Sequence, residues 1–485
     1  MNTDADDLAA FGYRQELQRG IGGFSSFAVA FSLISVLTGV FANFDHGLRH
    51  VGGAVPWSWL VVLAGQLLVA LVLADLAVRM PLSGYGYQWT SRLANPHAGF
   101  FVGWMLLVQF LSGFPGVCAT LARHAAPLLG PGWTTPRGLA LLTLAVIALV
   151  AFVHLAGLRL VAACNDAGVW AELVGVALLV AGLLAVAALG GASPAILFDA
   201  RTASGRPSGP GDWALSLLLG AWCLTGFEAA ADLAEETLQP RRTVPRAILG
   251  SLLAAGLAGL LLLVGLCMAI SDLAATQASP APLSALLRAT FGDSGMSMIL
   301  GVVGASVFAC ALASMAAASR LLFSLARDGM LPGSRLLAAV EPGRGTPAVA
   351  IAFVWAISSA VVIALPVLDV VTQISAVAGY IGYAGILLAA ICAGSPPPEG
   401  GFTLGRARPI VGWAALAWVI GVTLALTLPA TEFPGVATRH LPAVSTAVAA
   451  AGGLALYLCF TRRRILAGSA GPPTMQPPSS GPLGR

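Results

Sequence analysis

Long apolar stretches alternate with short polar connections along almost the whole chain. A helix needs about 20 apolar residues to cross a hydrocarbon core of roughly 30 Å, and the chain supplies that length again and again. The pattern therefore predicts an all-α membrane protein with twelve transmembrane helices. The expected spans are 24–45, 57–78, 98–121, 138–156, 166–189, 213–234, 247–270, 295–318, 347–366, 370–393, 410–429 and 442–460.

The order of the spans also predicts how the chain is organised. Little length remains for a separate soluble domain, and the stretch after the last span is rich in Pro, Gly and Ser, which is typical of disorder. We expect an N-terminal segment over 1–23, a ten-helix core over 24–393 in two groups of five (24–189 and 213–393), two additional helices within 410–460, and a disordered tail over 461–485.

Composition and charge agree with a membrane protein. Hydrophobic residues make up 58% of the chain and charged residues 9%, a balance that a soluble domain would not keep in water. The 25 basic residues are all arginines, and most fall in the connections on the side of the N-terminus. By the positive-inside rule, both termini should lie in the cytoplasm and the protein in the plasma membrane. The net charge of +4 reflects that bias rather than a nucleic-acid partner.

Cysteine and histidine give no sign of catalysis or metal binding. The seven cysteines are scattered singly through apolar spans, where they are expected to be small buried hydrophobes. The six histidines are isolated, and none pairs with an acid at metal-ligand spacing. A channel is also disfavoured, because no ring of charged residues indicates a continuous pore. We expect no enzyme activity, no metal and no cofactor.

Small and polar residues interrupt the first span at mid-depth. Ser35, Val36, Leu37, Thr38 and Gly39 form this stretch. Backbone groups freed by an interruption within a membrane must find partners, and unwound backbone could grip a ligand. A close-packed helix crossing of small residues is the alternative explanation.

The sixth span carries a second interruption. Thr225 and Gly226 lie at mid-membrane, flanked by the aromatic side chains Trp222 and Phe227 and followed by Glu228. The first and sixth spans each begin a group of five, and the two groups have opposite orientation across the membrane. This arrangement is typical of an inverted repeat with a binding site at the midplane.

Several longer motifs carry a family resemblance over residues 11 to 460. The chain resembles the amino acid-polyamine-organocation (APC) superfamily, and within it the amino acid/choline transporter branch. The resemblance implies a LeuT-type fold, which is a 5+5 inverted repeat plus two C-terminal helices, working by alternating access without a cofactor. The motifs are 12–19, 35–39, 80–89, 226–237 with 244–247, and 319–332.

The resemblance also implies where a substrate would bind. In such relatives it lies between the broken first and sixth helices, with its carboxylate on first-helix amides and its amine near sixth-helix carbonyls, because half-helix ends present dipoles of fixed sign. Applied to this chain, the substrate-binding residues are Ser35, Val36, Leu37, Thr38, Gly39, Gln109, Trp222, Thr225, Gly226 and Phe227. Trp222 would attract an ammonium through its ring face. Packing is the alternative role for Trp222, and interhelical hydrogen bonding for Gln109.

Two acids within spans are candidates for proton coupling. An ionisable group in an apolar span is costly, so Glu228 is a functional candidate, with simple bonding to nearby backbone as the alternative. Glu172 occupies the position where some proton-coupled relatives carry a lysine, and this chain has no lysine at all. Glu172 could accept a proton, coordinate a cation or lie at a helix contact. Ser306 and Ser314 could approach the position of the sodium site in relatives, with ordinary buried serines of a small-residue helix as the alternative.

Charged residues also gather at the expected cytoplasmic ends of the spans. They are predicted to form gating or structural ion pairs, whose partners the sequence does not assign. They are Asp75, Arg79, Glu235, Glu236, Arg241, Arg327 and Asp328.

The sequence thus predicts a secondary transporter, a permease or an exchanger, for amino acids or related small amines. Its partners would be that small-molecule substrate, membrane lipid and H+ as a candidate coupling ion, with Na+ not excluded. A permease for choline, 4-aminobutyrate or ethanolamine on the same fold is one alternative. A membrane sensor that binds a ligand without moving it is the other, since the same pocket would serve.

Overall fold

The computed structural model confirms an all-helical chain. No strand occurs in the part of the chain that it describes, where only two isolated bridges pair extended residues. The predicted start of the N-terminal segment and residues 474–485 of the predicted tail lie outside the described residues. The described residues are 8–9, 11–15, 19–340, 346–364, 368–393, 401–427 and 440–473.

The first membrane-spanning stretch consists of two helices. α2 (Gly23–Ile34) ends at Ser35, and α3 (Val36–Val51) begins directly after it. Ser35 has a positive φ of 32°, which interrupts the α-helical backbone between them. The break lies within the interrupted stretch that the sequence singles out.

The second interruption separates short helices. α10 (Leu218–Cys223) ends shortly before Gly226, whose φ of 103° favours glycine, and α11 (Ala229–Asp232) resumes after it. The turn η4 (Ala234–Glu236) continues α11. The chain therefore crosses this region as helix, non-helical break and helix.

The remaining elements are mostly long helices. Several exceed the predicted spans, because helices in membrane proteins continue beyond the hydrocarbon core. Their bounds are η1 (Gly52–Ala54), α4 (Val55–Arg79), α5 (Tyr85–Leu93), α6 (Pro96–Leu129), η2 (Pro131–Thr134), α7 (Pro136–Ala156), α8 (Leu158–Leu189), η3 (Pro194–Phe198), α9 (Pro210–Ser216), α12 (Pro240–Met268), α13 (Leu273–Ala278), α14 (Pro282–Arg327), α15 (Ser334–Leu337), α16 (Ala348–Ala364), α17 (Leu368–Cys392), η5 (Gly405–Ala407), α18 (Arg408–Leu426), α20 (Leu441–Leu456), a π-helical turn (Tyr457–Thr461) and α21 (Arg462–Leu466).

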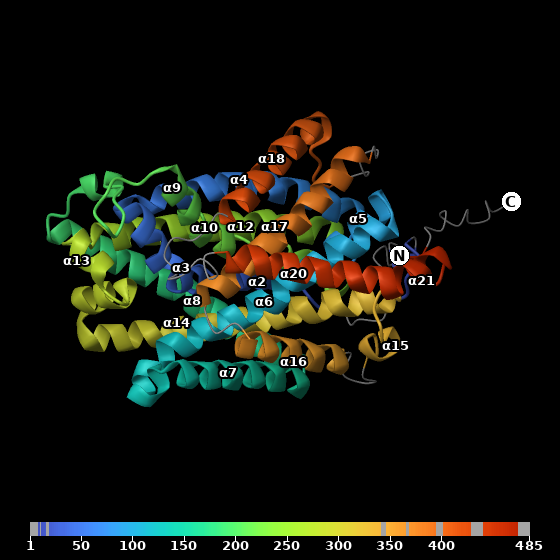
Figure 1. Ribbon diagram of the computed structural model, residues 1–485, viewed down its shortest axis with the longest axis horizontal. Helices are drawn as coiled ribbons and strands as arrows, with labels where there is room; N and C mark the ends of the chain where they lie inside the picture. Colours follow the sequence, from blue (N-terminus) through green and yellow to red (C-terminus); the bar gives the residue numbers. More distant parts are fainter. Residues whose placement is uncertain are drawn as a thin grey trace.

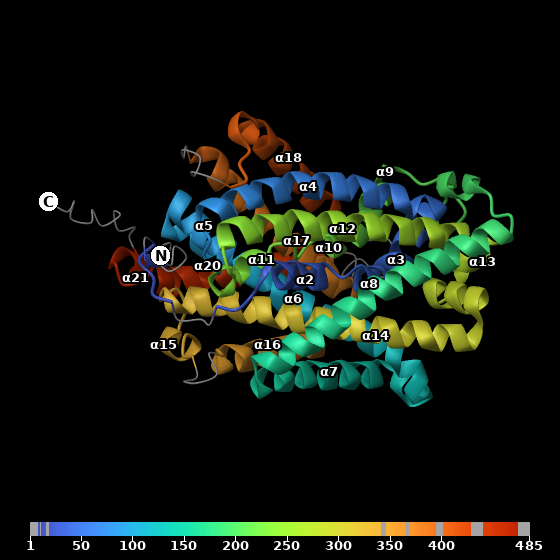
Figure 2. The ribbon, with the colours of Figure 1, turned by 180° about the vertical axis from the view of Figure 1, so that it is seen from behind.

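The long helices run roughly side by side and enclose the broken ones (Figure 1). α4 packs on α12, α6 packs on α17, and α14 contacts both α6 and α8. From behind, α8 crosses the bundle obliquely (Figure 2). α2, α3, α10 and α11 lie among these helices, where Val36, Phe227 and Ala230 are fully buried.

Length and apolar composition mark nine helical stretches of the described residues as able to cross a membrane. The predicted count of twelve differs for physical reasons. The first two predicted spans fall within one stretch, Gly23–Arg79, the sixth is divided by its break, and Ala348–Ala364 is apolar but shorter. A multi-span membrane protein is therefore confirmed.

The prediction that all seven cysteines are buried is wrong. Cys118, Cys223, Cys267 and Cys310 are buried, and Cys164 is partly exposed. Cys392, at the end of α17, and Cys459, in the π-helical turn, are exposed. An apolar sequence context does not guarantee a covering neighbour, either at a helix end such as that of Cys392 or along the continuous helical stretch that contains Cys459.

The bundle has two distinct ends. We call the end that carries α5, α15 and the N-terminal segment the α15 end, and the opposite end, with α9 and α13, the α13 end (Figure 1). At the α13 end, Arg206 forms two hydrogen bonds to Asp212, at 2.7 and 2.8 Å, and the Gly209 amide donates a third at 2.8 Å. Nδ1 of His50 lies 3.6 Å from the same carboxylate.

We expect the stabilisation from these contacts of Asp212 to depend on pH. Burial raises the pKa of Asp212, but the bonds from Arg206 and the Gly209 amide outweigh it and hold the pKa below its usual value. The stabilisation is therefore full above about pH 4 and disappears as pH falls through the lowered pKa. Asp212→Asn should lower the melting temperature of the purified protein by a few degrees at pH 7, and by much less near pH 3.

Asp199→Asn is the matched control, because Asp199 also pairs with an exposed arginine, Arg201, but its own side chain is more exposed than that of Asp212 (25% against 9%), so that its pair contributes less. A melting difference for Asp212→Asn that is the same at both pH values would contradict the linkage.

Candidate functional site

A small cavity of about 40 Å³ lies where the two broken helices meet α6, α14 and α17. Its wall combines apolar and aromatic side chains with a few hydroxyl and amide groups, as small-molecule sites usually do. The lining residues are Leu33, Ile34, Thr38, Gln109, Phe110, Gly113, Phe114, Val117, Trp222, Cys223, Thr225, Gly226, Cys310, Ser314 and Ser375.

Two glycines let the broken helices approach one another. A Cβ on Gly39 of α3 would overlap the Cys223 side chain at the end of α10. A Cβ on Gly226 would lie only 2.8 Å from Leu33 Cγ, at the end of α2. Each break therefore packs against the other, and any larger side chain at these positions would separate them.

Glu172 on α8 stabilises the break between α2 and α3. Its Oε1 accepts a hydrogen bond from the Leu37 amide at 3.2 Å, and the side chain is only 1% exposed. Beside it, Ser35 Oγ lies 2.6 Å from the Thr38 hydroxyl and 3.2 Å from the Ser306 hydroxyl on α14. Glu172 thus accepts the hydrogen bond of a first-helix amide, and the family resemblance assigns such amides to a substrate carboxylate.

Glu228 accepts a backbone amide at the second break, as Glu172 does at the first. Its Oε2 accepts the Gly226 amide at 3.0 Å, and Gln109 Nε2 donates to Oε1 over 3.4 Å. Glu228 is fully buried. Because Gln109 and Gly226 line the cavity, this carboxyl lies directly behind the cavity wall.

The aromatic residues at the second break have different roles. Trp222 lines the cavity and is 8% exposed. Thr225 also lines it, although its hydroxyl donates to the Trp222 carbonyl at 2.7 Å. Phe227 points away from the cavity and stacks on Tyr383 of α17 with ring centroids 6.0 Å apart. Phe227 is thus a packing residue in this conformation.

The ten predicted substrate residues divide into two groups. Thr38, Gln109, Trp222, Thr225 and Gly226 line the cavity. The other five are buried in the wall behind it, where they shape the breaks. These are Ser35, Val36, Leu37, Gly39 and Phe227.

Sequence reasoning missed part of the lining. Phe110 and Phe114 come from α6, one turn apart, and Ser375 comes from α17, where its hydroxyl donates to the Gln109 carbonyl at 2.9 Å. The polar run from Thr372 to Ser375 inside an apolar span is a signal that could have identified α17. Two phenylalanines in an apolar helix give no comparable signal.

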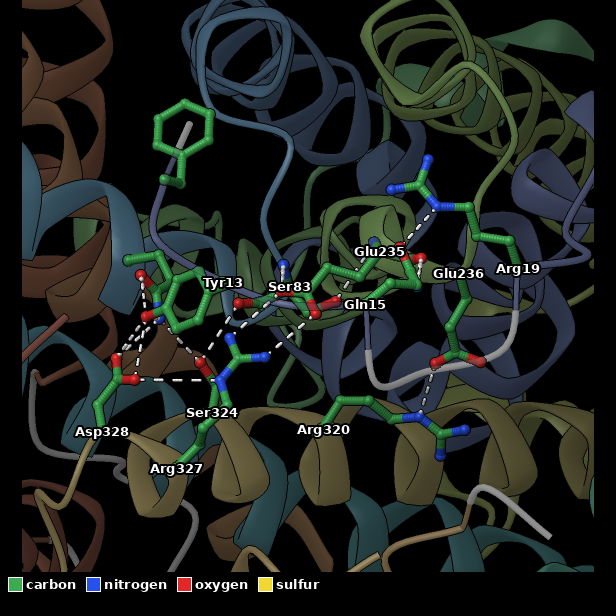
Figure 3. Close-up of polar contacts among 12 residues, drawn as sticks. Tyr13, Gln15, Arg19, Ser83, Glu235, Glu236, Arg320, Ser324, Arg327 and Asp328 are labelled. Atoms are coloured by element: carbon green, nitrogen blue, oxygen red, sulfur yellow. Dashed lines mark hydrogen bonds and ion pairs between the residues drawn. The ribbon is translucent and has the colours of Figure 1, made fainter. Parts of the chain in front are cut away.

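Several charged residues at the α15 end form ion pairs that connect different elements (Figure 3). Arg327 of α14 contacts Glu235 of η4 at 3.1 Å, and Arg320 contacts Glu236 at 3.2 Å. The Ser83 amide donates to the same Glu235 carboxylate at 3.2 Å. These contacts tie the loop before α5, the end of the second break and α14 together.

The N-terminal segment adds to this network. The Tyr13 hydroxyl donates to both carboxylate oxygens of Asp328, at 3.0 and 2.9 Å (Figure 3). Burial, and then the charge of Asp328, raise the pKa of Tyr13, so its phenol stays protonated and remains a donor. Tyr87 and Gln88 donate to Asp328 as well, at 2.7 and 2.9 Å. We call this group of side chains the α15-end network. It consists of Tyr13, Ser83, Tyr87, Gln88, Glu235, Glu236, Arg320, Arg327 and Asp328.

The other predicted charged residues also have partners. Arg79 bonds Asp75 at 2.9 Å, one turn away on α4, and Arg408 lies 3.5 Å from the same carboxylate. Arg241 donates to the Val78 carbonyl at 2.8 Å. These contacts fasten α12 and α18 to the end of α4.

Known proteins resemble the chain along most of its length. A family model described as amino acid permease matches residues 21–451. The amino-acid permease BAT1 of Arabidopsis thaliana is 28% identical over 95% of this chain and 94% of its own length. Its Oryza sativa homolog is 28% identical over 87% of each, and a putative polyamine transporter of Candida albicans is 26% identical over 90% of this chain and 82% of its own. The chain belongs to the amino acid permease family of the APC superfamily.

Proposed function

We propose that this permease is a secondary active transporter that moves amino acids or related small amines across the plasma membrane by alternating access. One observation carries the proposal: a small cavity with polar groups lies at the meeting point of two broken helices inside an otherwise apolar bundle. Irregular backbone at membrane depth is tolerated only where protein or a cavity covers it. The relatives named as amino-acid permeases and as a polyamine transporter support this substrate class.

The helix ends give the cavity a polarity that suits a zwitterion. The N-terminus of α3, beside Thr38, carries partial positive charge and would attract a carboxylate, whereas the C-terminus of α10, at Cys223, would attract an amine. Trp222 would add its ring face for the ammonium. Since Leu37 already bonds Glu172, the carboxylate would meet the first helix near Thr38 rather than at Leu37.

We further propose twelve membrane crossings arranged as a 5+5 inverted repeat with two additional helices. In this scheme α2 with α3 forms one broken crossing, and α9 to α11 form the other. The 17-residue helix Ala348–Ala364 also crosses, and α18 and α20 follow the core.

The direction of opening follows from the contacts at the two ends of the bundle. The α15 end carries the arginine-rich connections, so we assign it to the cytoplasm, together with both termini. Its network of Glu235, Arg327 and Asp328 would have to break before the cavity could open to that side. The conformation described here is thus closed toward the cytoplasm.

Transport and ligand sensing can be separated by counterflow. Liposomes that contain the purified protein and an excess of unlabelled ligand should accumulate the labelled ligand transiently, because only a carrier exchanges one for the other. Amino acids, choline, ethanolamine and 4-aminobutyrate, first screened by thermal shift, supply the ligands. A ligand that binds but shows no exchange would favour the non-transporting sensor.

We expect Trp222→Ala to weaken binding of the best ligand about tenfold, since a desolvated cation–π contact contributes roughly 1–2 kcal/mol. Trp222→Phe, which keeps a ring, should lose less. Isothermal titration of the purified variants measures both values. Trp170→Ala is the control, because Trp170 lies on the exposed side of α8. Equal affinities for Trp222→Ala and the wild type would remove Trp222 from the site.

The two buried acids can be compared through the pH dependence of uptake. Gln in place of Glu keeps an oxygen that accepts the Gly226 or Leu37 amide but cannot exchange a proton. If Glu228 carries the coupled proton, Glu228→Gln should flatten the profile while Glu172→Gln preserves it. An unchanged profile in Glu228→Gln would move the coupling role to Glu172.

A further inference from the structure

A second fully buried acid, Asp232, lies one helical turn beyond Glu228. The Asp232 amide donates to the Glu228 carbonyl at 3.2 Å, so the two side chains lie on the same face of α11. Their carboxyl groups are close enough to interact electrostatically. Neither the cavity lining nor the α15-end network includes Asp232.

The carboxyl of Asp232 has no hydrogen-bond partner on either oxygen within the described residues. The Gly84 amide approaches it but does not reach hydrogen-bond geometry. A buried carboxylate without partners is strongly disfavoured, so the site requires a proton or a cation. This requirement points to a ligand and not merely to a cluster of acids.

The buried hydroxyls of Tyr85 and Tyr380 near the acids have no hydrogen-bond partner among the described residues, and the Tyr383 hydroxyl lies next to the Glu228 carboxyl. Tyr85 interacts electrostatically with both Glu228 and Asp232, while Tyr380 and Tyr383 interact with Glu228. Tyr85 thus interacts with both carboxyls without a hydrogen bond to either.

The pair lies between the cavity and the α15-end network. On one side, Gln109 joins Glu228 to the cavity wall. On the other side, Arg320 interacts electrostatically with Asp232 and pairs with Glu236 of the network. Polar groups therefore continue from the substrate cavity to the end of the bundle through Glu228 and Asp232.

We propose that Glu228 and Asp232 form one proton-binding site, in which the two carboxyls share a single proton, and that Asp232 exchanges it with the α15 end. In the transfer, the O–H bond of Glu228 breaks as an O–H bond forms on Asp232, so that the proton passes from one carboxyl to the other. The negative charge moves from Asp232 to Glu228. This inference rests on the proposed coupling role of Glu228.

The other groups near the pair fit a shared proton. Like charges so close in an apolar interior disfavour a doubly ionised pair. Arg320 is the cation that faces the pair, and it is already paired with Glu236. Of the other helices packed on α11, α2 has no titratable residue, and the arginines of α12 lie in its first two turns. These are Arg241, Arg242 and Arg246.

Infrared difference spectroscopy of the full chain in lipid nanodiscs tests the site without any substrate. The probe is the proton itself, and the readout is the carbonyl band of protonated carboxyl groups during a pH titration. The wild type should lose this signal in two steps more than about one pH unit apart, as coupled groups do. Asp232→Asn should remove one step, and a spectrum identical to the wild type would overturn the proposal.

Two further variants keep the test decisive. Asp232→Glu retains a carboxyl, so it should restore two steps with a displaced band if Asp232→Asn fails to fold; an undisplaced band would contradict the proposal. Asp75→Asn is the matched control, because Asp75 is equally buried but paired with Arg79 and Arg408. It should leave both steps in place.

Transport then separates this inference from the proposed function. With the ligand identified by counterflow, Asp232→Asn should still exchange ligand but lose ligand-driven proton movement, measured with a pH dye inside the liposomes. If the wild type shows two titration steps but no exchange, the proton site stands and the transport proposal fails. If Asp232→Asn keeps full proton movement, the role of Asp232 fails and the transporter remains.

Discussion

The structure depends on a constraint of the membrane: a helix that breaks in an apolar environment leaves backbone N–H groups that must find partners. In this chain a buried acid accepts a backbone amide at each break. The acid at the first break lies far away in the sequence, and the acid at the second break lies within the break itself. Glu172 of α8 accepts the Leu37 amide, and Glu228 accepts the Gly226 amide. The same groups that stabilise the breaks therefore bring ionisable carboxyls next to the cavity, and the proposed coupling would use residues on which the fold also depends.

Close approach of the two breaks follows from the same constraint. Gly39 lets α3 approach Cys223 at the end of α10, and Gly226 lets the second break approach Leu33 at the end of α2; the cavity lies beside these contacts. At the α15 end, polar contacts of Glu235, Arg327 and Asp328 join loops and helix ends that lie far apart in sequence. Such contacts can be broken and remade more readily than the packed core, which suits a bundle that opens at its ends.

The sequence predicted the helical class, the membrane setting and both breaks, because apolar length and mid-span Ser, Thr and Gly are local signals. It could not predict that Phe227 packs on Tyr383 while Trp222 lines the cavity, because both are aromatic and five residues apart. The orientation of a side chain depends on the backbone turn at Gly226. Likewise, Asp232 looks like any charge near a span end until tertiary packing buries it.

The most direct test of the central claim is a structure determined with the best-binding amino acid or amine. The account predicts ligand density between the N-terminus of α3 and the C-terminus of α10, with an amine near Trp222 and a carboxylate, if present, near Thr38. Density that lies elsewhere in the bundle, with this cavity unchanged, would contradict the assignment of the two helix breaks as the substrate site.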